Sequence, residues 1–494
     1  MKTRHGGRGR ILGPGAHEDR RRQQVTYAVL VASVVAFMLT QSTVNPVLPR
    51  IQAELDSSQN TVTWVMTANL LAASVATPLM GRLGDAYGRK RMLVVAVAAL
   101  SVGALLAAVA PNIGVMIAAR VIQGIGGGTM PLAFGLVRDH FEPRSVSGRV
   151  GLLASLGGVG LASGLVVAGP IVEHLGYTWL FLLPALVTAV VALAAWLYIP
   201  ASEALGRVRL PWLPAILLSG SLVLLLLGIS QAPRRGWLSA PILVSLVGGV
   251  LLAVTWVVSE LRAPVPLVDM RLMRRRAVWT TNLIALLVGA GMYSVQAFLP
   301  AVLQTPSEVG YGFSASVTHS GLMLLPFAVM SFVGGVIAAS VLRRCGPRVA
   351  TGAACVTASA GLATLGLLHD EVWQIFIALA LVGLGFGLVY AALSSLVVGA
   401  VPASQTGVAA GMNANIRTIG GSIGVAAMSS IVTAKILPSG FPVESAYTTG
   451  FLVLAGVTAV AAVCGLLVPA QVPPPGVIRP EPVPGDPVSG RLSR

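Results

Sequence analysis

Charged and amide side chains inside long apolar runs are the residues of this sequence with the clearest potential for chemistry. Arg120 lies in the run IAARVIQGIGGG with Gln123 three residues later, and Arg417 lies in GMNANIRTIGG four residues after Asn413. A guanidinium inside a hydrocarbon layer is costly unless it faces protein or water, so such residues usually belong to a substrate or ion site. Residues 81–91, GRLGDAYGRKR, place one carboxylate among four cations. These patterns indicate ion pairing and binding.

Patterns of catalytic, nucleotide and metal sites are missing from the sequence. Cys345, Cys355 and Cys464 have no paired spacing, and two of them lie in apolar segments, where cysteine acts as a small apolar filler. No GxxxxGK[ST] motif, nucleophile elbow or polar catalytic cluster occurs. We therefore expect no enzyme activity, no metal and no cofactor.

Long apolar runs must position the polar residues described above. The chain has 494 residues, of which 55% are hydrophobic and 10% are charged, and its mean hydropathy is +0.83. The runs are about twenty residues long, which is the length of an α-helix that crosses a bilayer. The sequence therefore predicts an all-α integral membrane protein with fourteen transmembrane helices. Their approximate ranges are 26–48, 62–82, 92–110, 114–136, 149–172, 177–199, 212–230, 239–260, 279–303, 317–342, 348–368, 372–399, 405–434 and 446–468.

The distribution of charge predicts how the chain sits in the membrane. The net charge is +16, but the basic residues lie in the tails and in alternate loops rather than on one face of a folded domain. This pattern is typical of the cytoplasmic loops of a membrane protein and does not indicate nucleic-acid binding. We expect a multi-pass protein of the cell membrane with both termini in the cytoplasm.

The predicted helices fall into groups of six, two and six. GRLGDAYGRKR after the second helix has a weak counterpart, ASVLRRCGPRV, after the tenth, and internal repeats of this kind form two pseudo-symmetric halves in many transporters. The expected divisions are a disordered basic cytoplasmic tail (1–24), a six-helix bundle (25–200), two additional helices with linkers (201–277), a second six-helix bundle (278–470) and a disordered Pro-rich cytoplasmic tail (471–494).

The motif at residues 81–91 permits two interpretations. It is either a solvated positively charged anchor or a conformational latch whose contacts form in one state and break in another. The motif resembles the signature of the major facilitator superfamily between its second and third helices. The resemblance implies a latch made by Gly81, Asp85, Gly88, Arg89 and Arg91.

The fourth predicted helix also resembles its counterpart in this superfamily. The resemblance implies that Arg120, with Gln123 near the same face, takes part in proton coupling, and the alternative is that Arg120 extends toward the outer interface. Four nearby glycines indicate close helix packing.

The fifth predicted helix resembles the antiporter motif of the exporter branch at Gly160, Gly164 and Gly169, and departs from it at Leu165 and Ala168. The resemblance implies export, and the alternative is a simple packing face of small residues.

The end of the first predicted helix, LTQSTVNPVLPRI, resembles the fourteen-helix drug:proton antiporters, the multidrug efflux branch. Thr40 occupies the position at which that branch carries an acidic residue. A threonine does not titrate in the physiological range, so proton coupling through this helix and a preference for cations are both called into question. The resemblance as a whole extends from about Val25 to Leu467.

The resemblance implies a secondary transporter of the major facilitator fold that exports amphipathic small molecules, such as drugs or antibiotics, by alternating access. The implied energy source is the proton gradient, in antiport, and the implied partners are the substrate, protons and the lipid bilayer, with the protein as a monomer. The candidate polar residues of a central cavity are Thr40, Gln41, Asn45, Gln296, Asn413 and Arg417.

Two alternatives remain at this point. One is export of a lipid, a siderophore or an endogenous secondary metabolite with atypical coupling, in which a neutral or anionic substrate pairs with Arg417 or Arg120. The other is a non-transporting receptor or assembly protein on the same fold. For Arg417 itself, a purely structural role in a buried polar network is equally consistent with the sequence.

Overall fold

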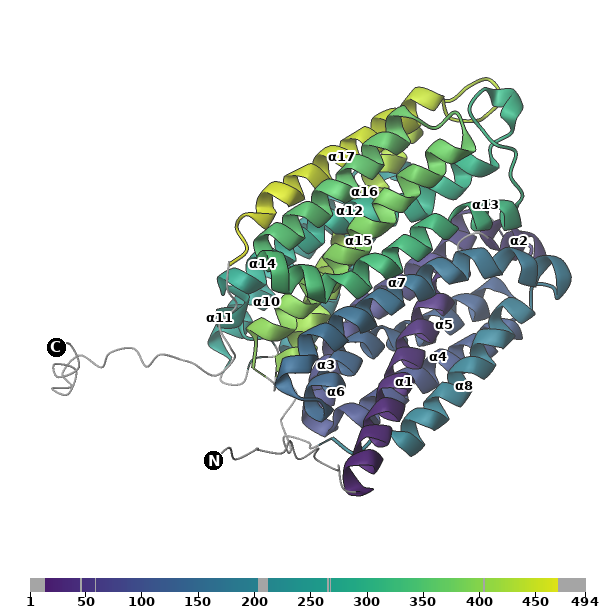
Figure 1. Cartoon of the computed structure of the whole chain (residues 1–494). Helices are drawn as coiled ribbons and strands as arrows, with labels where there is room; N and C mark the ends of the chain where they lie inside the picture. The colour runs from purple at the N-terminus through teal and green to yellow at the C-terminus, as the bar shows by residue number, and fades with distance from the viewer. Residues whose placement is uncertain are drawn as a thin grey trace, which may run out of the picture.

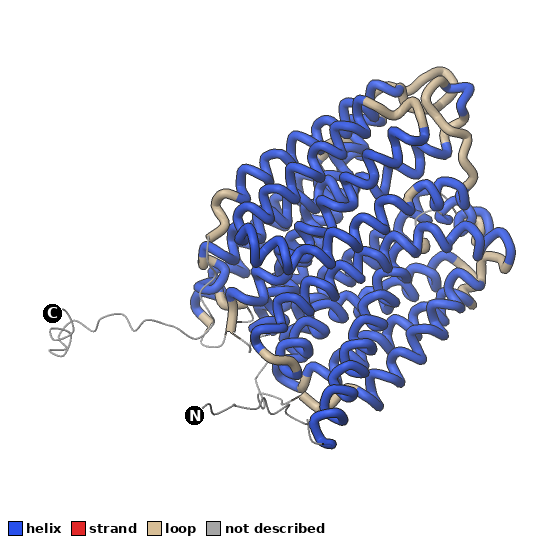
Figure 2. The backbone as a smooth tube through the Cα atoms, in the orientation of Figure 1, coloured by secondary structure: helices blue, strands red, loops and turns tan. Residues whose placement is uncertain are grey.

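The computed structural model describes residues 14–44, 47–57, 59–202, 212–263, 266, 268–402 and 405–469. Within these ranges the chain is helical with no β-strand, apart from one isolated bridge between Ile436 and Pro442 (Figure 2). A helix pairs its interior backbone groups within itself, which is what a segment surrounded by hydrocarbon requires. The all-helical class predicted from the apolar runs is confirmed.

The helices form two bundles joined by an additional pair (Figure 1). The first bundle comprises α1 (Pro14–Ser42), α2 (Leu48–Glu54), α3 (Gln59–Tyr87), α4 (Arg89–Ala108), α5 (Ile113–Gly124), the 3₁₀ turn η2 (Ile125–Gly128), α6 (Thr129–His140), α7 (Pro143–His174) and α8 (Trp179–Tyr198). The pair comprises α9 (Trp212–Arg235) and α10 (Ala240–Arg262). The second bundle comprises α11 (Met270–Met273), α12 (Arg276–Gln304), η3 (Ser307–Val309), α13 (Val317–Met323), α14 (Leu325–Leu367), α15 (Val372–Ala400), α16 (Thr406–Val432) and α17 (Glu444–Gly465).

Eleven helical segments of the described residues are long and apolar enough to cross a membrane. Two of the predicted helices, the tenth and the eleventh, are merged in one of these segments, because α14 continues across a kink at Gly346, where φ is +75°. The helices α7 and α16 coincide with the fifth and thirteenth predicted helices and are not among the eleven. Several membrane-spanning helices are therefore established, and the number fourteen remains a prediction.

The first helix differs from its predicted range. It begins at Pro14, so residues 14–24 are helical rather than part of a disordered tail. Proline is favoured in the first turn of a helix, and the arginines and glutamines that follow are good helix formers. The rest of the predicted N-terminal tail and residues 471–494 lie outside the described residues.

The two bundles meet along two lines of contact. On one, α7 packs against α14 and α15, and on the other, α3 packs against α16. The helix α9 packs against both α3 and α16, while α10 packs mainly against α9. Figure 1 shows the first bundle at the lower right and the second at the upper left. The additional pair therefore covers the junction between α3 and α16.

The first turn of α1 and the last turn of α17 lie at the same end of the molecule, at the lower left of Figure 1. At this end the carbonyl of Leu467 accepts a hydrogen bond from Arg276 Nε at 3.0 Å. The carbonyl of Val468 accepts one from Arg348 Nε at 2.7 Å. The loops predicted to be cytoplasmic therefore gather where the two ends of the described chain lie; we call this the basic end.

Candidate functional site

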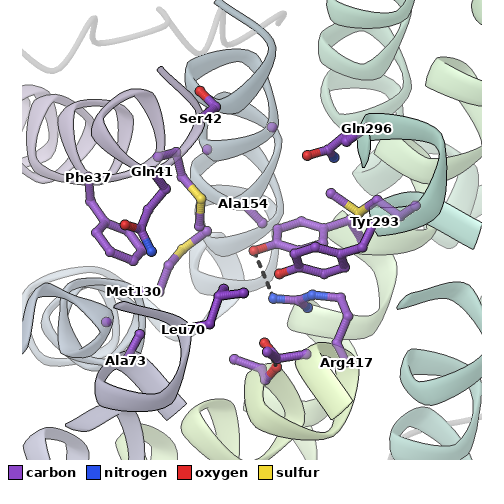
Figure 3. A pocket seen from close by; sticks show the side chains of 18 of the residues that line it. Phe37, Gln41, Ser42, Leu70, Ala73, Met130, Ala154, Tyr293, Gln296 and Arg417 are labelled. Atoms are coloured by element: carbon purple, nitrogen blue, oxygen red, sulfur yellow. Dashed lines mark hydrogen bonds between the residues drawn. The ribbon is translucent and has the colours of Figure 1, made fainter. Parts of the chain in front are cut away.

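A cavity of about 160 Å³ lies between the two bundles. It is lined by residues of α1, α3, η2, α6 and α7 from the first bundle and of α12, α14, α15 and α16 from the second. In Figure 3, Phe37, Gln41 and Met130 line one side, and Tyr293 and Arg417 line the other. The predicted central cavity is thus present, and both halves of the chain form its walls.

Arg417 is the charged residue of this cavity. Its side chain is 7% exposed, and its Nη2 donates a hydrogen bond to the hydroxyl of Tyr390 at 3.0 Å. The guanidinium carbon lies 4.1 Å from the centre of the Tyr390 ring, in cation–π geometry. Glycine at position 289 permits this placement, because a Cβ there would lie 2.2 Å from the Arg417 carbonyl. Tyr390 was not among the predicted site residues, although a tyrosine inside an apolar helix was a usable signal.

The wall from the first bundle is largely apolar, and its polar side chains are one amide pair and the hydroxyls of four serine and threonine residues. Asn69 Nδ2 donates to Gln41 Oε1 at 2.7 Å. Methionines at positions 38, 66 and 130 also line the cavity, and methionine adapts readily to ligands of different shape. Asn69 was also absent from the predicted residues.

Three of the six predicted cavity residues line the cavity, namely Gln41, Gln296 and Arg417. Thr40 does not, because it is buried and its hydroxyl donates to the Ala36 carbonyl at 2.7 Å. Adjacent positions of a helix point about 100° apart, and the cavity-facing side of α1 carries Phe37, Met38, Gln41 and Ser42, so Thr40 falls outside that side.

Asn413 was likewise predicted to line the cavity and does not. It donates to Asn282 Oδ1 at 2.9 Å and, with Arg417, borders a much smaller neighbouring pocket. Its buried amide therefore connects α16 to α12. Asn45 lies outside the described residues.

Buried ion pairs connect three helices at the basic end. Arg89 Nε and Nη2 donate to Asp85 Oδ1 at 2.9 and 2.7 Å. Arg89 Nη1 donates to Asp139 and to the Gly135 carbonyl. The network joins α3, α4 and α6, and the left-handed Gly88, with φ +100°, connects the first two of these.

The predicted pairing of Asp85 with Arg89 is thus present, and the latch function assigned to it remains a prediction. Arg91, which was predicted to belong to the latch, is exposed and makes none of the network's hydrogen bonds. It points away because it lies two positions beyond Arg89 on the same helix.

Arg138 joins the two bundles beside this network. Its Nη1 donates to the carbonyls of Val398 and Val401 at 2.8 and 2.7 Å and to Thr406 Oγ1 at 2.7 Å. The carbonyls at the C-terminal end of a helix such as α15 lack helical partners and carry negative partial charge. Arg138 was not among the site residues predicted from the sequence, so its contact between the bundles was missed.

The bundles also touch through backbone at this end. A Cβ on Gly81 would lie 2.8 Å from the Gly407 carbonyl oxygen, so the predicted motif glycine permits α3 and α16 to meet. Further along, Asn415 Nδ2 donates to the Ser74 carbonyl at 2.7 Å. The cavity is therefore closed toward the basic end.

Arg120 lies outside the cavity lining and is fully buried. Its Nε donates to the Val65 carbonyl at 3.1 Å, and its Nη1 donates to Gln123. The interpretation that it extends to the outer interface is therefore wrong. Its Nη2 is buried without a hydrogen-bond partner among the described residues, which leaves one donor free for a partner in another conformation.

The three predicted glycines of α7 serve two contacts. A Cβ on Gly160 would lie 2.7 Å from the Val35 carbonyl, and one on Gly164 would lie 2.6 Å from the Leu39 carbonyl, so both pack against α1. A Cβ on Gly169 would lie 2.5 Å from Thr318 Oγ1, in the second half. The helix α7 therefore packs tightly on α1 and also touches the opposite half.

Comparison with known proteins agrees with this architecture. Residues 30–425 match the sequence model of the Major Facilitator Superfamily. The chain is 30% identical over 476 residues to the cephamycin export protein CmcT of Amycolatopsis lactamdurans, covering 93% of this chain and 96% of that protein. It is 30% identical over 415 residues to the puromycin resistance protein pur8 of Streptomyces alboniger, covering 82% and 81%. The crystal structure of the human organic anion transporter MFSD10 (TETRAN) superposes with a TM-score of 0.63 at 16% identity, covering 90% of this chain and 99% of that chain, which shows a common fold.

Proposed function

The chain belongs to the Major Facilitator Superfamily, and from this premise we propose that it exports amphipathic small molecules through the central cavity by alternating access. It is a multi-pass membrane transporter and not an enzyme. The observation that supports export most directly is a cavity with walls from both bundles, largely apolar on one side and carrying Arg417 on the other. Two relatives aligned over most of the chain are named for antibiotic resistance and antibiotic export.

The proposal includes fourteen spans in a six, two and six arrangement with both termini in the cytoplasm. Support comes from α14, which contains two predicted spans, and from α7 and α16, which occupy the positions of two more. The basic loops at the end shared by α1 and α17 favour the cytoplasm for that end.

Alternating access requires the closed end to open. A cavity of about 160 Å³ is smaller than the roughly 300–1,000 Å³ of pockets for drug-sized ligands, so the bundles must separate for such a substrate to enter. The contacts that must break are those of Arg138 and of Gly81 with Gly407. The buried network of Asp85 and Arg89 lies beside them, which is where a latch would act.

Proton antiport is the energy source that we propose, with Arg120 assisting the coupling. The described lining of the cavity contains no carboxylate, and Thr40 replaces the acidic residue of the first helix, so the coupling differs in detail from that of the drug:proton branch. The free Nη2 donor of Arg120 supports a contact that changes between conformations.

Everted membrane vesicles provide the test. Addition of a cephamycin to vesicles that contain the chain should dissipate an imposed pH gradient, and vesicles with Asp85→Asn should respond much less. Correctly folded protein that gives no substrate-dependent dissipation with a varied set of compounds would contradict antiport.

The relationship to a cephamycin export protein favours a second possibility, export of a metabolite made by the cell itself. A deletion strain would then retain this compound, with little change in its sensitivity to added drugs. Increased drug sensitivity with unchanged secretion would favour the general efflux function instead.

A further inference from the structure

We propose that the transported molecules carry a negative charge, such as a carboxylate, and that Arg417 binds this group. The inference rests on the proposed export function and specifies its substrate class. It follows from the charges, the hydrogen-bond donors and the shape of the central cavity.

The described lining of the cavity contains one cation, Arg417, and no aspartate or glutamate. Its other polar side chains are amides and hydroxyls, among them Gln41, Gln296 and Tyr390. A cation in such an enclosed, weakly screened space attracts anions and repels other cations. The electrostatics of the cavity therefore favour an anionic ligand.

Arg417 is placed to bind a ligand. Its protein partner is the neutral Tyr390, which takes one hydrogen bond and covers one face of the guanidinium. Its Nε and Nη1 make no hydrogen bond within the described part of the chain. A buried guanidinium without an anion is unfavourable, and its planar edge matches the two oxygens of a carboxylate.

Another hydrogen-bond donor lies on the same wall of the cavity as Arg417. Gln296 is 8% exposed, and its Nε2 is buried without a hydrogen-bond partner among the described residues. Figure 3 shows Gln296 on the same side of the cavity as Tyr293 and Arg417. This wall thus offers unpaired donors on Gln296 and Arg417, which complement oxygen anions.

The opposite wall is largely apolar and uncharged, and its two amides, Gln41 and Asn69, are hydrogen-bonded to each other. Phe37, Leu70 and Met130 line it in Figure 3. The cavity therefore fits a molecule with an acidic group directed at α16 and an apolar body directed at α1, α3 and α6.

Arg120, the other arginine inside a predicted span, does not serve this purpose. It lies outside the cavity lining and already binds the Val65 carbonyl and Gln123. The choice between the two arginines, which the sequence left open, is therefore settled by position.

Three fluorescent probes that share one ring system test the proposal on the unmodified, full-length chain in lipid nanodiscs. They are anthracene-9-carboxylate, anthracene-9-carboxamide and 9-(aminomethyl)anthracene, with charges of −1, 0 and +1 at neutral pH. Equilibrium binding should be about tenfold or more tighter for the carboxylate than for the other two, the size expected of hydrogen bonds to a charged group. Equal binding of all three, no binding of any, or preference for the amine would overturn the proposal.

Two variants test whether Arg417 causes the preference for the carboxylate. Arg417→Gln should weaken carboxylate binding about tenfold and leave carboxamide binding nearly unchanged, while Arg344→Gln, at an exposed position, should change neither. Unchanged carboxylate binding by folded Arg417→Gln would contradict the assignment. If this variant does not fold, the comparison of the three probes on the unmodified chain still decides the charge preference.

The binding experiment tests the anion site, and the vesicle experiment tests export, so either proposal can fail without the other. Carboxylate-selective binding without transport in vesicles would refute export and keep the anion site. Transport that favours the amine would support export and refute the anion site.

Discussion

Arg89 and Arg138 lie at the same end of the molecule and have different kinds of partner. Arg89 binds carboxylates of its own half, Asp85 and Asp139. Arg138 binds carbonyls and a hydroxyl of the opposite half. The contacts of Arg138 must break when the halves separate, whereas those of Arg89 can change without the halves separating. At the scale of single residues, the hydrogen bonds of Arg138 therefore hold the two halves together more directly than those of Arg89 do.

Loss of the Arg138 hydrogen bonds should open the basic end. Each hydrogen bond from a charged donor is worth about 1.5–3 kcal/mol, so loss of the contacts in Arg138→Ala should raise the open population at least about tenfold. Ala414 lines the cavity, and the measurement is the rate at which an impermeant maleimide labels Ala414→Cys in everted vesicles, on a chain whose native cysteines are replaced by alanine. Arg144→Ala, an exposed arginine nearby, is the matched control. A labelling rate that does not change in Arg138→Ala would show that the contact does not hold this end closed.

At the scale of elements, α7 packs on α1 through glycines and touches α13 and α14 of the other half. The resemblance to an antiporter motif implies a functional role for these glycines, and the structure gives a physical reason for two of them. A side chain on Gly160 or Gly164 would meet the backbone of α1. Backbone cannot move aside as a flexible side chain can, so these positions should tolerate even a methyl group poorly.

Two substitutions in the same helix test this account. In Gly164→Ala, the added Cβ meets Ser42 and the Leu39 carbonyl, so we expect a loss of about 1–3 kcal/mol in the free energy of unfolding. In Gly148→Ala, the nearest atom, the Ala339 Cβ, lies at an ordinary contact distance of 3.8 Å, and alanine is the better helix former. Thermal unfolding in detergent should therefore show a lower midpoint for the first variant and an equal or higher one for the second. Equal midpoints would contradict the close contact with α1.

The sequence predicted the helices well and the contacts between them poorly. Runs of about twenty apolar residues define helices without reference to tertiary structure, and the motif of Asp85 and Arg89 is local, because the partners are four positions apart. Arg138 and Val398 are 260 residues apart, and neither carries a local pattern that points to the other. The cavity shows the same limit, because polar Thr40 and Gln41 are neighbours in sequence but face different directions.

At the scale of the whole molecule, two bundles meet at a cavity that is closed at one end. The additional pair α9 and α10 covers the junction of α3 and α16 without lining the cavity. Export by alternating access requires a second conformation, in which the two bundles separate at the closed end and the cavity opens toward the cytoplasm. Binding of an anion at Arg417 would place the substrate on the wall of the second half, opposite the largely apolar wall of the first.

The distance between the two bundles at the basic end tests this account most directly. Spin labels at exposed positions Arg91 and Arg274, on the cysteine-free chain in nanodiscs, report it by pulsed electron paramagnetic resonance. A second pair within the first bundle, at Arg91 and Arg144, is the control. Alternating access predicts two distances for the pair between bundles, with proportions that change with pH or with an added substrate, and one constant distance for the control. A single distance between the bundles under all of these conditions would contradict it.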